Sequence, residues 1–281
     1  MLDPAPARLS RDEVAECRER GFLHVRALFS FAETAAIRAR VAEHETRDAP
    51  VREHLTGGFF SHRGLTLADP ELAGLACDGR LLGPAVQMLG PHIRFMGVQS
   101  IRREPLGALP PGRTPERPGW HRDIFGMTRD LGGSAPLCAV KCALILSDAL
   151  EEADGGTRFL PGSPTLDRIA IPSGAIDPVG WVSPAARAGD VVFFGNRTFH
   201  AGGLNRSREA YRMILFQYGY RWLAPVVPGC HEDSAIIAAL PRLARQLLAP
   251  DETVDGEYRP GMGCTALIDW ARRHGLCEHG S

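Results

Sequence analysis

The sequence contains almost no lysine and has no excess of charge. Lys141 is the only lysine, so nearly all of the positive charge comes from arginine, and the formal net charge is −1. Proteins that bind nucleic acid or an anionic membrane usually carry a basic patch, which a near-neutral chain does not suggest. The sequence therefore predicts neither kind of partner.

The chain also lacks the patterns of a secreted or membrane-spanning protein. It has seven cysteines, an odd number at irregular spacing without a CxxC pair, which fits reduced thiols better than a disulfide framework. The N-terminus shows no signal-peptide pattern, and no apolar run approaches membrane-spanning length. We expect a cytoplasmic protein that acts as a monomer or homodimer on a small molecule.

The first third of the chain has helical patterns. Ser10 followed by Asp12 and Glu13 predicts a capped helix start, and Gly21 suits the end of that helix. Further along, the patterns predict a strand at 22–25, a helix at 31–41, a loop or lid at 46–66, and two short helices between 70 and 89.

The middle of the chain is rich in strand patterns, and helical patterns return afterwards. Strands are predicted at 93–101, 137–147, 157–160, 191–194 and 210–222, and helices at 233–248 and 265–274. We find no internal repeat and no linker. The sequence therefore predicts one mostly β domain over 1–281, with a helical part at about 1–90, a core at about 91–225 and a helical part at about 226–281. A double-sheet jelly roll fits the strand spacing.

Residues 119–123 read Gly-Trp-His-Arg-Asp and place His121 and Asp123 two positions apart. In an extended segment, side chains two positions apart point the same way, so this imidazole and this carboxylate can converge on one point. A second imidazole from a distant strand would complete a set of two histidines and one carboxylate. Such a set on one face of a metal, with other positions open, is typical of non-haem Fe(II) oxygenases.

The His-x-Asp pair indicates little by itself, because a surface histidine beside a solvated aspartate has the same spacing. Three neighbouring features favour a metal site. Trp120 can wall a dry site, and the Pro- and Gly-rich segment 105–118 can present side chains from a loop. His200 follows a predicted strand and precedes a turn whose glycines permit close backbone approach.

Three motifs occur in order within residues 10–225. They are Trp-His-Arg-Asp, then Gly-Gly-Thr-Arg-Phe-Leu-Pro-Gly-Ser, then Phe-His-Ala-Gly-Gly-Leu-Asn-Arg-Ser with an arginine-bearing strand after it. In this combination the sequence resembles the phytanoyl-CoA dioxygenase family of Fe(II)- and 2-oxoglutarate-dependent oxygenases. The resemblance implies a cupin-like jelly-roll core, a double-stranded β-helix. It also implies Fe(II), 2-oxoglutarate and O2 as cofactor and cosubstrates.

The resemblance further implies the metal ligands. His121, Asp123 and His200 would bind the iron and form the catalytic centre. Related halogenases have a small residue at the position of Asp123, which leaves room for chloride. The carboxylate at this position therefore disfavours halogenation.

The resemblance predicts an arginine that binds 2-oxoglutarate. In the family it usually lies eleven residues after the distal histidine, and Tyr211 occupies that position here. We assign the role to Arg212, assuming a one-residue slip in the turn, and keep Arg206 and Arg208 as alternatives. A guanidinium suits this role because it holds a carboxylate through two parallel charge-assisted hydrogen bonds.

Three further polar residues have two interpretations each. Gln99 and Thr157 match family positions that often bind 2-oxoglutarate, but either could instead satisfy backbone groups. Lys141 lies in an otherwise apolar strand. It could pair with a carboxylate of the substrate or cosubstrate, but we favour a stem along the sheet with the ammonium in water.

The sequence thus predicts a dioxygenase that hydroxylates, or otherwise oxidises, an unactivated C–H bond of a small molecule, with release of succinate and CO2. A natural-product intermediate or an amino-acid derivative is the expected substrate. Two alternatives stay open. One is a hydrolase or isomerase that uses Zn or Mn at the same ligands, and the other is a non-catalytic metal-binding jelly-roll protein.

Overall fold

A seven-stranded antiparallel sheet forms the centre of the computed structural model, with strand order β1-β7-β5-β9-β4-β3-β2. The structure describes residues 5–47, 53–54, 58–63, 69–108, 119–123, 131, 135–171, 176–226, 235–248, 253–254, 257–258 and 265–277. The strands of the sheet are β1 (Phe22–Val25), β2 (Glu53–His54), β3 (Phe59–Arg63), β4 (Ile93–Arg103), β5 (Ala139–Ile145), β7 (Val191–Gly195) and β9 (Tyr211–Tyr220).

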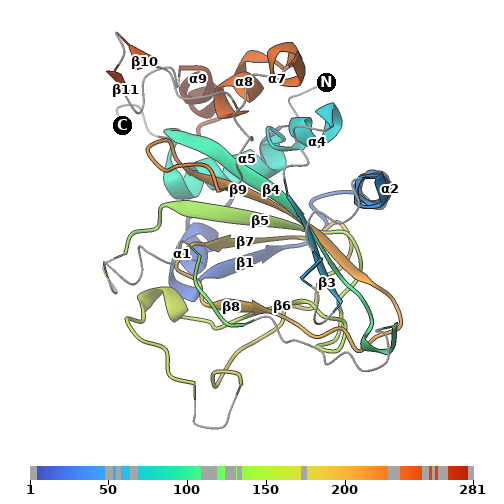
Figure 1. Cartoon of the computed structure of the whole chain (residues 1–281). Coiled ribbons are helices and arrows are strands. Elements are labelled where there is room, and N and C mark those ends of the chain that lie inside the picture. Colours follow the sequence, from blue (N-terminus) through green and yellow to red (C-terminus); the bar gives the residue numbers. More distant parts are fainter. Residues whose placement is uncertain are drawn as a thin grey trace.

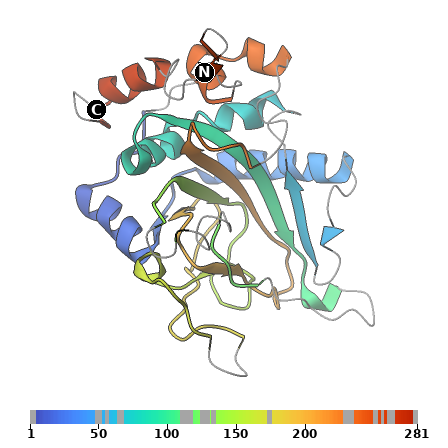
Figure 2. The same cartoon turned by 60° about the vertical axis from the view of Figure 1, so that its left-hand side comes forward.

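Helices cover one face of the large sheet, and a small sheet lies on its other face. Helices α5 (Gly79–Leu89), α8 (Arg242–Leu248) and α9 (Thr265–Arg273) pack above the sheet, while β6 (Thr157–Phe159) and β8 (His200–Gly202) pair below it (Figure 1, Figure 2). The other elements are α1 (Arg11–Arg20), α2 (Phe31–Arg47), α4 (Pro70–Leu75), η1 (Leu106–Ala108), η3 (Ser163–Thr165), α7 (Ala235–Ala239), β10 (Thr253–Val254) and β11 (Glu257–Tyr258). This arrangement confirms the mostly β prediction with flanking helices.

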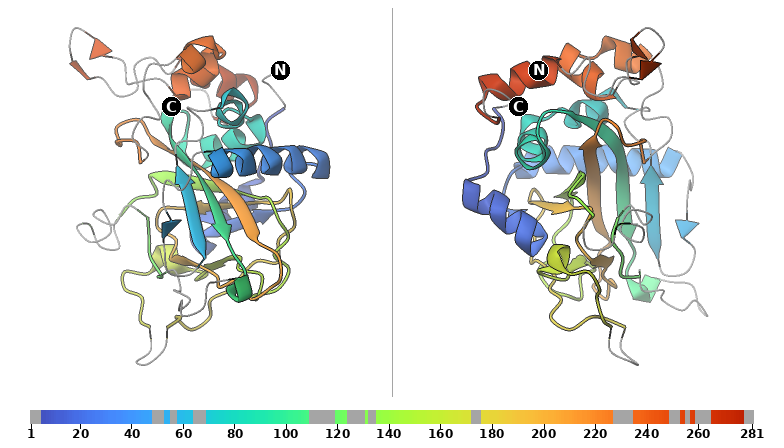
Figure 3. Two further views of the ribbon diagram at one scale, coloured as in Figure 1. Left: turned by 45° about the vertical axis from the view of Figure 1, so that its right-hand side comes forward. Right: turned by 90° about the vertical axis from the view of Figure 1, so that its left-hand side faces the viewer.

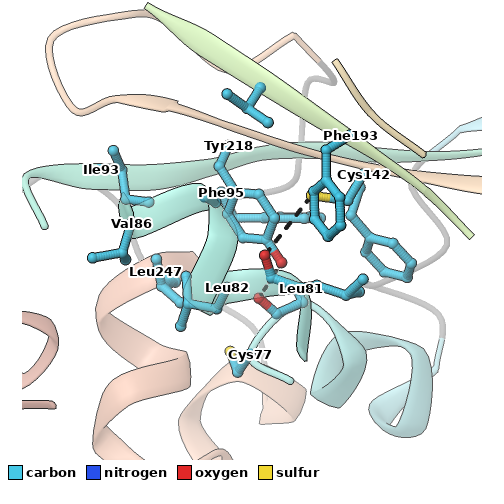
Figure 4. Close-up of a cluster of buried hydrophobic side chains, with 14 of the residues drawn as sticks. Cys77, Leu81, Leu82, Val86, Ile93, Phe95, Cys142, Phe193, Tyr218 and Leu247 are labelled. Carbon is cyan, nitrogen blue, oxygen red and sulfur yellow. Dashed lines mark hydrogen bonds between the residues drawn. The ribbon is translucent and has the colours of Figure 1, made fainter. Parts of the chain in front are cut away.

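The alternation of side chains along β9 produces two separate cores. Phe216 and Tyr218 point toward the helices and join the larger cluster, whereas Met213 and Leu215 point toward the small sheet. Figure 4 shows the larger cluster, in which the Tyr218 hydroxyl donates to the Ala76 carbonyl at 2.8 Å. The sheet therefore has one structural face and one face that is shared with the small sheet.

A β-bulge in β4 decides which of its residues face the small sheet. Phe95 is opposite Tyr218 and Gly97 is opposite Gln217, so Met96 is an extra residue. Gly97 has a φ of 152°, a conformation that glycine adopts at little cost. Beyond the bulge the alternation is shifted by one residue, which turns Arg103 toward the small sheet.

Several predicted element boundaries are confirmed. Ser10 forms a capping box with Glu13, and Gly21 ends α1 in the left-handed conformation with a φ of 100°. The strand at 22–25 is β1, and the other predicted strands correspond to β4, β5, β6, β7 and β9. Among the described residues, no helix is long and apolar enough to cross a membrane.

Other boundaries were predicted wrongly. Residues 46–66 are not one loop, because α2 continues to Arg47 and the strands β2 and β3 extend the sheet beside β4. The predicted helix at 233–248 is two helices, α7 and α8, separated near Pro241, whose ring and missing N–H disfavour a continuous helix. The strand β8 was not predicted. Residues 109–118 of the predicted loop lie outside the described part of the chain.

Candidate functional site

Two histidines that are far apart in the sequence are brought together by a β-bridge. The His121 N–H donates to the His200 carbonyl at 2.9 Å, and the His200 N–H donates back to the His121 carbonyl at 3.0 Å. Residues that exchange both bonds lie directly opposite each other with their side chains on the same side. The two imidazole centroids are accordingly 4.3 Å apart.

Backbone carbonyls set which ring nitrogen of each histidine can bind a metal. Nδ1 of His121 lies 3.0 Å from the Gly119 carbonyl, and Nδ1 of His200 lies 2.9 Å from the Thr198 carbonyl. A carbonyl only accepts hydrogen bonds, so each Nδ1 carries the hydrogen. Each Nε2 is then left with its lone pair, which is the form that ligates a metal.

Asp123 completes the set. One ligand atom each from His121, Asp123 and His200 lies within 4.8 Å of the other two. Asp123 Oδ2 is buried and has no hydrogen-bond partner. A buried carboxylate oxygen without a partner is costly, and a cation placed between it and the two imidazoles would satisfy it. Two imidazoles and one carboxylate fit a divalent transition metal with open positions. The structure thus brings together all three predicted ligands.

Lys141 makes a contact that neither interpretation of the sequence foresaw. Its Nζ lies 2.7 Å from Asp123 Oδ1, and the two side chains are 16% and 13% exposed. The favoured interpretation, an ammonium in water, is therefore wrong. Oδ1 of Asp123 thus lies between the Lys141 ammonium and Nε2 of His121, which is 3.9 Å away, while Oδ2 has no hydrogen-bond partner.

The electrostatics of the site suit metal binding at neutral pH. Burial lowers the pKa of His200 to about 4, so its imidazole is neutral. Burial alone would raise the pKa of Asp123, but the Lys141 ammonium and the neighbouring imidazoles outweigh that effect, and its pKa is lowered. The site therefore offers a neutral imidazole and an ionised carboxylate.

A cavity of about 730 Å³ opens beside these three residues. Gln99 and Thr157 both line it, which is compatible with their predicted role in binding a cosubstrate. The Gln99 amide donates to the Ser61 hydroxyl, and Thr157 Oγ1 lies 3.8 Å from the sulfur of Met213. Much of the remaining described wall is apolar, contributed by residues such as Phe59, Met96, Ile101, Phe194, Leu215 and Val226.

A buried polar network supports the segment that carries His121. The indole N–H of Trp120 donates to Asp177 at 2.8 Å, and Arg158 donates to the same carboxylate at 2.5 Å. The Trp120 ring also stacks on Phe199 with a centroid distance of 5.3 Å. These contacts anchor the loop end next to His121. Trp120 itself does not line the cavity, contrary to the prediction that it walls the site.

Arg212 lies on the wrong face of the sheet for its predicted role. It is opposite Arg102 in the β4–β9 pairing, and its Nε lies 3.9 Å from Glu45 of α2, which crosses this helix-covered face (Figure 3). Its neighbours Tyr211 and Met213 point the other way. Strand alternation thus contradicts the assumed one-residue slip.

The two alternatives are no better placed. Arg206 and Arg208 are exposed residues in the turn that precedes β9. Neither lines the cavity. The family pattern places the cation eleven residues after His200. In this chain that position is occupied by Tyr211, an uncharged residue that is 2% exposed.

The cavity contains an arginine that the sequence interpretation missed. Arg103 lies at the end of β4 and lines the cavity. It is opposite Tyr211 in the sheet, with its guanidinium carbon 5.2 Å from the Tyr211 ring centroid. The only signal in the sequence was the position of Arg103, two residues beyond the strand predicted at 93–101.

Comparisons with known proteins agree with this geometry. Residues 17–214 match the family model for phytanoyl-CoA dioxygenase (PhyH). Ectoine dioxygenase of Bordetella parapertussis is 28% identical over 230 residues, which cover 71% of each chain. Dioxygenase trt7 of Aspergillus terreus is 28% identical over 130 residues, covering 46% of this chain and 44% of the relative.

Solved structures share the fold. HygX from Streptomyces hygroscopicus, with nickel and 2-oxoglutarate bound, has a TM-score of 0.64 at 19% identity and covers 78% of this chain and 90% of its own. The alpha-ketoglutarate-dependent epimerase SnoN from nogalamycin biosynthesis has a TM-score of 0.64 at 22% identity, with 87% and 96% covered. These likenesses confirm the predicted jelly roll.

Proposed function

Because this chain belongs to the phytanoyl-CoA dioxygenase family, we propose that it is an Fe(II)- and 2-oxoglutarate-dependent oxygenase that hydroxylates a C–H bond of a small molecule. The reaction converts substrate, 2-oxoglutarate and O2 into hydroxylated product, succinate and CO2. One oxygen atom of O2 enters succinate and the other enters the product.

The convergence of His121, Asp123 and His200 on one point beside a cavity is the observation that carries this proposal. Iron(II) held there, with 2-oxoglutarate bound, would supply the oxidising chemistry. His121, Asp123 and His200 would hold the ion, and the cavity beside them would leave room for cosubstrate and O2. Lys141 holds Oδ1 of Asp123, which favours metal binding through one carboxylate oxygen only.

The cavity supports a small-molecule substrate. Its volume of about 730 Å³ lies in the range of ordinary ligand pockets. The named relatives include an ectoine dioxygenase, and one neighbouring structure holds hygromycin B. We therefore propose an amino-acid derivative or a natural-product intermediate. Asp123 at the third ligand position supports oxygenation over halogenation.

We place the enzyme in the cytoplasm. Among the described residues, Cys17, Cys77, Cys142 and Cys277 are free thiols, and the first three are buried. Unpaired thiols are usual in a reducing compartment. Cys230 and Cys264 lie outside the described residues.

Succinate formation tests the proposal. The protein is purified without oxygen and incubated with Fe(II), 2-oxoglutarate, ascorbate and O2, with and without a panel of candidate substrates. We expect succinate well above the amount formed by the His121→Ala variant, and an oxygen atom from labelled O2 in the product. Because neighbouring structures include an epimerase and a carbocyclase, product analysis by mass spectrometry accompanies the assay.

Three outcomes would redirect the proposal. Succinate without product oxygen would indicate an oxidation other than hydroxylation. Metal binding without 2-oxoglutarate binding would favour a hydrolase or isomerase that uses Zn or Mn. Binding of both without succinate across the substrate panel would favour a non-catalytic binding protein.

A further inference from the structure

We propose that Arg103 of β4 binds the far carboxylate of 2-oxoglutarate, with the hydroxyls of Tyr211 and Thr157 beside it. The proposal rests on the function proposed above and names the residue that performs one part of it. The cation that anchors 2-oxoglutarate is thus assigned to β4 and not to β9, the strand on which the sequence pattern placed it.

Within the part of the chain that the structure describes, Arg103 is a buried cation without a counter-ion. Its residue is 5% exposed, and no described carboxylate forms an ion pair with it. One guanidinium nitrogen donates to the Gly155 carbonyl, while Nε is buried without a partner. The nearby Arg158, by contrast, pairs with Asp177 at 2.5 Å. A buried charge that lacks a partner is costly, so an anion entering the cavity would relieve that cost.

The electrostatic environment agrees with this assignment. Desolvation, opposed by Tyr211 and assisted by the positive charge of Arg158, lowers the pKa of Arg103 to about 10. The guanidinium still remains protonated at neutral pH. A carboxylate at this position would meet the Arg103 guanidinium, whereas Arg158 does not line the cavity and already pairs with Asp177.

The position of Arg103 relative to the metal ligands fits a five-carbon diacid. Thr157 is opposite Gly202, two residues along β8 from His200, which corresponds to roughly 7 Å along a strand. Thr157 Oγ1 and the Tyr211 hydroxyl both contact the sulfur of Met213, at 3.8 and 3.5 Å. Tyr211 in turn lies under the Arg103 guanidinium. Thr157 therefore lies opposite a position about 7 Å along β8 from His200, and Tyr211 and Arg103 follow it at the same end of the cavity.

Tyr211 explains why the cation comes from β4. Residues 103 and 211 are directly opposite each other, so either side chain can supply a group to the same end of the cavity. With tyrosine on β9, the only charged partner in that pair is Arg103. The phenol can donate one hydrogen bond to a carboxylate, and the guanidinium can donate two.

A comparison of two 2-oxo acids tests the assignment by binding alone. 2-Oxopentanoate has the carbon chain of 2-oxoglutarate but a methyl group in place of the far carboxylate. Both acids are titrated calorimetrically into Mn(II)-loaded protein without oxygen. The ratio of the two dissociation constants gives the preference for the far carboxylate. We expect the wild type to bind 2-oxoglutarate roughly 10- to 100-fold more tightly, as for hydrogen bonds to charged groups. Arg103→Met should lose this preference while its affinity for 2-oxopentanoate stays the same.

Matched controls lie on the opposite face of the same two strands. Arg102→Met and Arg212→Met each remove a guanidinium that lies near Glu45 on the helix-covered face. Both variants should keep the wild-type preference. Mn(II) affinity and the melting temperature, measured for every variant, separate loss of the anchor from loss of the fold.

Each outcome decides the proposal. An Arg103→Met variant that keeps the preference would overturn it, and loss of the preference in Arg212→Met would return the role to Arg212. If Arg103→Met does not fold, Arg103→Lys keeps the charge but not the two-bond geometry, and an unreduced preference in that variant would overturn the proposal. A wild type that binds neither acid would instead refute the proposed function.

Discussion

Replacing the single lysine by methionine should show how much the ion pair between Lys141 and Asp123 stabilises the metal-free protein. Lys141→Met removes the ammonium while keeping a side chain of similar length. Asp123 Oδ1 then loses its partner at 2.7 Å, and Oδ2 already has none. The metal-free variant therefore contains a carboxylate, 13% exposed, whose remaining described partner is Nε2 of His121 at 3.9 Å, beyond hydrogen-bond distance.

The structure sets the size of the effect. Removing one partner of a fully buried ion pair costs about 3–5 kcal/mol in the free energy of unfolding. Because both groups keep some contact with solvent, at 16% and 13% exposure, we expect about 2–3 kcal/mol. For a chain of this size, that loss corresponds to a decrease in melting temperature of roughly 4–10 °C.

Thermal unfolding with and without Mn(II) measures the effect. Saturating Mn(II) should raise the melting temperature of Lys141→Met more than that of the wild type, because the cation replaces the lost partner of Asp123. A double-mutant cycle with Asp123→Asn should give a coupling energy of about 2 kcal/mol. An unchanged melting temperature in the metal-free variant, or equal stabilisation of both proteins by Mn(II), would refute the reasoning.

Two further predictions concern a ligand and a structural carboxylate. His200→Ala should weaken Mn(II) binding by more than about 100-fold in calorimetry, because His121 and Asp123 alone make an incomplete set of ligands. The circular dichroism spectrum should stay unchanged. Mn(II) affinity within tenfold of the wild type would exclude His200 as a ligand. Asp190 has a lowered pKa, because hydrogen bonds from two backbone N–H groups and His24 outweigh the opposing effect of burial. The stability that it confers is therefore full above the unfolded-state pKa of about 4 and lost as the pH falls through the lower folded-state pKa. Asp190→Asn should cost about 1–3 kcal/mol in urea unfolding at pH 7. The difference from the wild type should shrink in acid, and a difference independent of pH would contradict this account.

The sequence identified the three residues that converge at the candidate metal site because the signal was local. His121 and Asp123 are two positions apart, and His200 lies in a recognisable motif, so the three ligands could be named without coordinates. The capping box at Ser10 and the helix stop at Gly21 were predictable for the same reason. Each of these features depends on a few consecutive residues.

The features that the sequence missed depend on long-range pairing. Strand alternation shows which side of the sheet a residue faces only if the pairing register of the strand is known. In β4 the extra residue at Met96 changes the register of pairing with β9. The strand β3, between β4 and β2, was missed because Ser61 and His62 interrupt any apolar alternation. The partner of Lys141 could not be predicted either, because Asp123 reaches it from a loop eighteen residues away.

The bulge at Met96 also bears on how tolerant the cavity is to change. If the bulge were straightened with the first half of β4 kept in place, every later residue of β4 would move by one position and turn its side chain to the opposite side of the sheet. Position 102 would then lie opposite Tyr211 and enter the cavity, and position 103 would leave it. Both positions carry arginine, so a strand that slipped by one residue would still present a guanidinium to the same end of the cavity. Arg102 would thus replace Arg103 after a register slip of one residue.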